Sequence, residues 1–158
     1  MEPMEPRIET RPAIKLVGVA FNPEQHGWHL VPSLWYRLCW EVPAIPNHAR
    51  PGVSFGYAYA QDCPTPGIDT YLAGIEVTCF DDVPERLAKV TVPAGQYAAF
   101  TVKGGLGAIP EAYGFINETW LPQSGFREAR CGAVEVYDER FVPSGLSEFE
   151  IRVAVERV

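Results

Sequence analysis

Two stretches of the chain carry the same helical stripe, each preceded by one strand pattern and followed by two more. The first stripe has the spacing i, i+3, i+4, i+7, i+11 of an amphipathic helix, in Val31, Leu34, Trp35, Leu38 and Val42. The second stripe has the same spacing, in Ile109, Ala112, Tyr113, Ile116 and Trp120. Pro32 and Pro110 stand where each helix begins, because proline is tolerated only in the first turn.

Strand patterns surround both stripes in the same order. We expect strands at 13–21, 53–59 and 71–80 in the first half, and at 96–103, 131–138 and 149–156 in the second. The halves overlay at a shift of about 80, which predicts one repeat over 13–80 and another over 89–158. The predicted fold is α+β, with duplicated β-α-β-β units in a single domain over 1–158. They would form a pseudo-two-fold antiparallel sheet with two helices on one side and a ligand groove between the repeats.

Composition narrows the classes of function. The 158 residues carry a net charge of −7, which argues against direct nucleic-acid binding because that requires a basic face. No apolar run approaches the roughly 20 residues of a membrane span, and residues 1–12 read as a polar, loose lead-in without a signal peptide. We therefore expect a cytoplasmic protein that does not bind membranes. Four cysteines lack C-x-x-C spacing and three histidines lack partners at ligand spacing, so no metal or other cofactor is predicted.

The strand at 133–137 places a carboxylate in a run that otherwise reads as core. Alternation puts Val134 and Val136 on one face, and Glu135 with Tyr137 on the other. The expected helices would cover the valine and small-residue faces, which leaves the tyrosine and glutamate faces to line a cavity. The alternative is an edge strand with Glu135 facing water, because glutamate is rarely buried.

The shift of 80 also places an aromatic strand of the first half at the same position as Glu135. It superimposes Phe55 on Glu135 and Tyr57 on Tyr137. The predicted ligand-binding residues are Glu135, Tyr137, Trp120, Tyr57, Tyr59 and Phe55. Weaker candidates, which we expect to be core residues, are Trp35, Tyr97 and Phe100.

Several segments of the second half resemble a known family. They are Val92–Phe100 (VPAGQYAAF), Lys103-Gly104, Trp120–Gly125 (WLPQSG) and Glu135–Asp138 (EVYD). The chain is similar over nearly its whole length to the GyrI-like effector-binding domain, the small-molecule-binding half of many AraC- and MerR-type bacterial regulators. The resemblance implies multidrug binding, with hydrophobic, often cationic ligands held at Glu135 among aromatic side chains. It also implies a link to transcription regulation, although we find no segment here for a helix-turn-helix, so DNA reading would belong to a partner.

The same resemblance leaves two other functions possible for this chain. Some members of the wider family resemble hydrolases that open strained-ring electrophiles, and Glu135 with Tyr57 or Tyr137 would then act as acid or base and orienting group. Other members inhibit DNA gyrase by binding a protein, which would make this chain a protein-interaction module. The sequence does not determine the ligand, a protein partner or regulator, or the oligomeric state.

Overall fold

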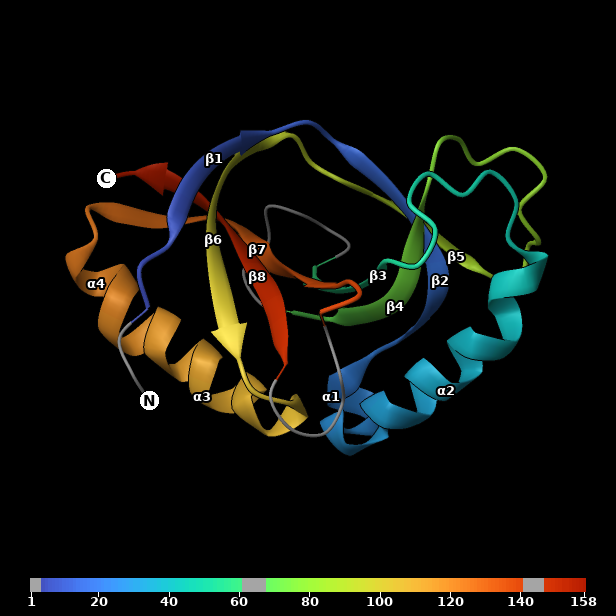
Figure 1. Ribbon diagram of the computed structural model, residues 1–158, viewed down its shortest axis with the longest axis horizontal. Coiled ribbons are helices and arrows are strands. Elements are labelled where there is room, and N and C mark those ends of the chain that lie inside the picture. The colour runs from blue at the N-terminus through green and yellow to red at the C-terminus, as the bar shows by residue number, and fades with distance from the viewer. Residues whose placement is uncertain (1–3, 61–67, 141–146) are drawn as a thin grey trace.

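In the computed structural model, residues 4–60, 68–140 and 147–158 are described. Eight strands within them form one sheet in the order β1-β6-β8-β7-β3-β4-β2-β5, with every neighbouring pair antiparallel. The strands are β1 (Arg7–Arg11), β2 (Ile14–Phe21), β3 (Ser54–Tyr59), β4 (Thr70–Val77), β5 (Ala88–Val92), β6 (Gly95–Lys103), β7 (Phe126–Tyr137) and β8 (Glu148–Arg157). The sheet curls strongly, and the helices lie along one side of it (Figure 1). The fold is therefore α+β, as predicted.

Two helical stretches connect the strands. The first comprises α1 (Pro23–His26), η1 (Trp28–Leu30), α2 (Val31–Glu41) and η2 (Val42–Ala44). The second comprises η3 (Leu106–Ala108), α3 (Ile109–Gly114), the π-helical η4 (Phe115–Trp120) and α4 (Leu121–Gln123). Proline lies in the first turn of both α2 and α3, as the sequence predicts. Among the described residues, no helix is long and apolar enough to cross a membrane.

Both main helices pack on the same face of the sheet. Leu34 and Leu38 of α2 share a core cluster with Ala58 of β3, and Ile116 shares another with Ala133 of β7. Ala58 and Ala133 are directly opposite each other in the β3–β7 ladder, so they point to the same face. The other face carries a third cluster, which contains Phe55, Tyr57, Val134 and Val136.

The expected assignment of faces was therefore wrong in the second half. The helices cover the face of β7 that carries Glu135 and Tyr137, and Val134 and Val136 lie on the other one. The cause is register. Glu135 is paired with Gly56, whereas Phe55 is paired with Val136, so Phe55 and Glu135 point to opposite faces. Paired residues of β3 and β7 are an odd number of positions apart in the sequence, so residues 80 apart on these two strands point to opposite faces.

The predicted loose lead-in contains a strand. β1 pairs with β6 along its whole length, from Arg7 opposite Ala99 to Arg11 opposite Gly95. Its sequence, RIETR, lacks the apolar alternation that would have revealed it. β1 precedes β2 in the chain but pairs with β6, and β5 precedes β6 but pairs with β2. Each edge strand therefore ties one half of the chain to the other.

The contact between β2 and β4 depends on two small residues. Gly18 lies opposite Gly74, and a Cβ atom added to Gly18 would meet the Ala73 carbonyl oxygen at 2.0 Å. We expect Gly18→Ala to lower the free energy of unfolding by about 1–3 kcal/mol, the usual effect of overpacking, in urea denaturation. Gly114→Ala is the control, because Gly114 has helical φ and open space around it, and it should leave stability unchanged or raise it. Equal stability of Gly18→Ala and the wild type would contradict this close approach.

Candidate functional site

Glu135 lies in the interior of the molecule. β7 is bonded to β8 on one side and to β3 on the other, so it is not an edge strand. Glu135 is only 5% exposed. The alternative that this carboxylate faces water is therefore wrong.

Three phenol groups donate hydrogen bonds to the carboxylate. The hydroxyls of Tyr71 and Tyr137 donate to Oε1 at 2.9 and 2.8 Å, and the hydroxyl of Tyr113 donates to Oε2 at 2.8 Å. The tyrosines come from β4, β7 and α3 respectively. A carboxylate needs such donors when it leaves water, because an unpaired buried charge is strongly destabilising.

The network keeps its tyrosines protonated. Burial raises the pKa of the phenols of Tyr71, Tyr113 and Tyr137 well above the ordinary value, and the charge of Glu135 raises each of them further. A hydrogen bond from the Trp35 side chain to Tyr71 acts in the opposite direction, as the smallest of the causes for that residue. At neutral pH all three groups therefore act as hydrogen-bond donors to the carboxylate.

More aromatic rings surround the tyrosines. Trp35 of α2 meets Tyr137 edge-on at 5.4 Å between centroids, and Phe149 of β8 stacks on the same tyrosine at 5.4 Å. Trp28 of η1 meets Tyr71 edge-on at 6.0 Å and is 52% exposed. Trp35 packs against the core clusters of both halves of the sheet. The carboxylate is thus enclosed by rings that α2, α3 and three strands supply.

Gly56 makes room for the network. A Cβ atom at this position would lie 2.4 Å from the Tyr71 hydroxyl and 2.6 Å from Oε1 of Glu135. Any larger residue opposite Glu135 would displace the carboxylate or its donor. The absence of a side chain on β3 is therefore as necessary to the site as the glutamate on β7.

Among the residues that the structure describes, the partners of the Glu135 charge are neutral donors. Within the described parts of the chain, Glu135 forms no ion pair with a lysine, arginine or histidine. The rings around it present π faces or edges, and a π face attracts cations. Chemically, such a site favours a positively charged, apolar molecule over a neutral one of the same shape.

The structure brings together only part of the predicted residue set. Glu135 and Tyr137 are in contact, as expected. Tyr57 and Tyr59 stack on each other at 4.4 Å, but they lie with Phe55 on the opposite face of the sheet. Of the two pairs considered for a hydrolase, Glu135 with Tyr137 lies on one face, whereas Glu135 and Tyr57 lie on opposite faces.

The remaining aromatic candidates lie in the core. Trp120 stacks on Phe126 at 6.1 Å and meets Phe100 edge-on, at the far end of the second helical stretch. Phe100 is fully buried. Tyr97 lies on the face opposite the helices and donates a hydrogen bond to the Pro93 carbonyl oxygen at 2.5 Å. The core placement expected for Phe100 and Tyr97 is confirmed.

Sequence reasoning missed two of the three donors. Tyr113 belongs to the predicted apolar stripe of the second helix, which marks it as facing the sheet but not as reaching Glu135. Tyr71 begins the strand predicted at 71–80, and it lies 64 residues from Glu135 in the sequence. Its role depends on the pairing of β4 with β3 and of β3 with β7, which no local pattern reveals.

These observations define a class of protein: an antiparallel α+β fold built around a buried glutamate that accepts hydrogen bonds from tyrosine hydroxyls. The family model of the GyrI-like small molecule binding domain matches residues 4–156, and the chain belongs to this family. The chain is 33% identical over 138 residues to the transcriptional regulator BrlR of Pseudomonas aeruginosa, covering 87% of this chain but 50% of the regulator. It therefore spans half the length of that relative.

Two further similarities cover almost the entire chain. A DNA gyrase inhibitor of Serratia proteamaculans is 28% identical over 171 residues, with 98% of this chain and 99% of the inhibitor covered. The structure of SAV2435 bound to tetraphenylphosphonium superposes with a TM-score of 0.74 at 16% identity, over 97% of this chain and 94% of the other. At that identity the superposition shows a shared fold.

The raised tyrosine pKa values predict a loss of stability in alkali. The unfolded chain releases its tyrosine protons near pH 10, whereas the folded chain keeps those of Tyr71, Tyr113 and Tyr137 to higher pH. The free energy of unfolding should therefore fall above pH 10, by up to about 1.4 kcal/mol per pH unit for each tyrosine. In urea denaturation from pH 9.5 to 11, Tyr113→Phe should reduce this slope by the contribution of one tyrosine, up to about 1.4 kcal/mol per pH unit. Tyr36→Phe, at a ring that is 67% exposed, is the control; equal slopes for all three proteins would contradict the network.

Proposed function

We propose that this protein binds hydrophobic, cationic small molecules at Glu135, as an effector- or drug-binding domain. The observation that carries the proposal is a buried carboxylate that has three neutral donors and, in the described chain, no cationic partner. Such a group leaves one charge to be balanced by whatever binds beside it. The tetraphenylphosphonium bound by SAV2435, which has a similar fold, is a ligand of this kind.

The site would occupy a groove at the seam of two repeated halves. The order of elements β2, α2, β3, β4 recurs as β6, α3, β7, β8, and the β3–β7 pair joins the two sets. Tyr71 and Trp35 come from the first set, whereas Tyr113, Glu135 and Tyr137 come from the second. A pseudo-two-fold relation between the halves accounts for this shared construction, with Gly56 as the small residue that faces Glu135 across the seam.

Ligand entry requires the rings to separate. Glu135 is 5% exposed and both of its oxygens already accept hydrogen bonds. A bulky cation would therefore have to displace aromatic side chains before it reaches the carboxylate. Trp28 is half-exposed and meets Tyr71 edge-on, so we place the entry route beside this ring. Contacts between a cation and these rings would contribute about 0.5–2 kcal/mol each.

Replacing the carboxylate by an amide tests the proposal. We expect Glu135→Gln to weaken the binding of tetraphenylphosphonium at least tenfold, because the amide keeps the shape of the side chain and removes its charge. Isothermal titration calorimetry on the purified protein gives the dissociation constants. Glu118→Gln, at an exposed position of η4, is the matched control and should bind like the wild type.

A neutral aromatic probe separates charge recognition from apolar contact. Triphenylphosphine oxide resembles the cation in its rings but has no net charge, so its weaker binding should be nearly the same in the wild type and in Glu135→Gln. Unchanged tetraphenylphosphonium affinity in Glu135→Gln, with circular dichroism showing an intact fold, would overturn the proposal.

Inhibition of DNA gyrase is the second candidate function. The similarity to the Serratia inhibitor extends over 98% of this chain and 99% of the inhibitor, unlike the match to half of the regulator. In a gyrase supercoiling assay, the purified protein should then slow supercoiling in proportion to its concentration, and Glu135→Gln should inhibit equally. Full supercoiling at a large molar excess of protein would exclude this function.

A further inference from the structure

The face of the sheet opposite the helices carries a group of charged side chains that the proposed function does not use. They lie on the two strands β1 and β8, which flank β6 in the sheet. The group consists of Arg7, Glu9, Arg11, Glu150 and Arg152. Glu150 and Arg152 are each 7% exposed, so this is a largely buried charge cluster at its β8 end.

The ion pairs form one alternating chain. Arg11 binds Glu9, and Arg7 binds both Glu9, at 2.8 Å, and Glu150. Glu150 in turn accepts from Nε of Arg152 at 2.7 Å. The order of charges is therefore Arg11, Glu9, Arg7, Glu150, Arg152. A guanidinium stands at each end of this chain.

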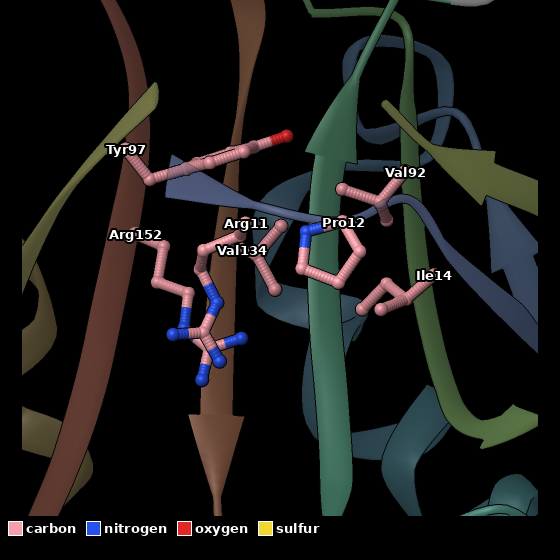
Figure 2. Close-up of a pocket in the computed structure, with 7 residues that line it drawn as sticks. All are labelled: Arg11, Pro12, Ile14, Val92, Tyr97, Val134 and Arg152. Atoms are coloured by element: carbon pink, nitrogen blue, oxygen red, sulfur yellow. The ribbon is translucent and has the colours of Figure 1, made fainter. Parts of the chain in front are cut away.

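The two arginines at the ends of this series of ion pairs meet at one small cavity. Arg11 and Arg152 both line it, and Figure 2 shows their guanidinium groups close together with the Tyr97 ring on the other side of the space. The remaining walls are apolar side chains of Pro12, Ile14, Val92 and Val134. Its volume of about 10 Å³ is room for one particle about the size of a water molecule.

The described residues of this cluster do not balance in charge. Three guanidinium groups face two carboxylates, which leaves one positive charge in the cluster. Burial lowers the pKa of Arg152 and the nearby charge of Arg11 lowers it too, while Glu150 and, to a smaller extent, Glu9 oppose these effects. An alternating ring of six charges would be complete if one anion stood between Arg11 and Arg152.

We propose that this cavity binds a small monovalent anion of the size of chloride, held between the guanidinium groups of Arg11 and Arg152. Arg152 uses Nε for Glu150, so its terminal nitrogens are left to donate to the anion. The side chain of Arg11 is 32% exposed, which opens the site to solvent. The cavity is too small for phosphate, and a chloride ion, which is larger than a water molecule, enters it when the partly exposed side chain of Arg11 moves outward. This site is separate from Glu135, because Val134 points to the other face of β7.

Chloride binding can be measured directly by the line width of the ³⁵Cl resonance in the presence of the protein. For the wild type, we expect excess broadening that saturates with chloride and is removed by bromide, which competes for the same space. Arg11→Gln should weaken this binding at least tenfold, because the ring then has a guanidinium at only one end. Arg11 is partly exposed, so this variant is expected to fold.

Two controls fix the interpretation. Arg127→Gln removes an exposed arginine that pairs with Glu156 outside the cluster, and it should broaden the signal like the wild type. Glu135→Gln should also leave chloride binding unchanged, so failure of the drug-binding proposal would not affect this one. Broadening of equal size in Arg11→Gln and the wild type, or broadening that never saturates, would overturn the anion site.

Discussion

The structure depends on one buried carboxylate that is held by three phenol groups. Glu135 occupies a central strand and cannot reach water, so its charge requires the donors that Tyr71, Tyr113 and Tyr137 provide. These donors lie on a strand of each half of the sheet and on a helix. The carboxylate therefore ties α3 to β7, and it connects β7 to β4, which strand pairing through β3 has already placed nearby.

The same requirement explains the small residues of β3. Gly56 lies opposite Glu135, and Ala58 lies opposite Ala133, so the helix-covered side of β3 leaves space for the aromatic rings. The larger side chains of this strand, Phe55 and Tyr57, fill the other face instead. One strand thus builds an apolar core on one side and leaves room for a polar, ring-enclosed site on the other.

The exchange of edge strands places the charged residues of β1 near those of β8, on the face of the sheet opposite the helices. β1 crosses to β6, where it lies one strand away from β8. Arg7 and Arg11 can therefore join Glu150 and Arg152 in one charge cluster, although about 140 residues separate them in the chain. The charge cluster therefore lies on the face opposite the helices, whereas Glu135 lies on the face that the helices cover. Membership of the GyrI-like family accounts for the fold, whereas the positive cluster follows from the residues of this chain.

The sequence by itself determined the class of fold, the start of both helices and the importance of Glu135. Periodicity is a local property, so Val31–Glu41 and the helix from Ile109 could be read directly, and a carboxylate within an apolar strand is visible without coordinates. The polar strand β1 was not predicted, because backbone pairing and ion pairs hold it in the sheet without any apolar alternation in its sequence. Only the tertiary structure decided that Gly56, and not Phe55, stands opposite Glu135, and that Tyr71 and Tyr113 reach it. Strand register selects which face each side chain occupies, and a displacement of one residue reverses every assignment.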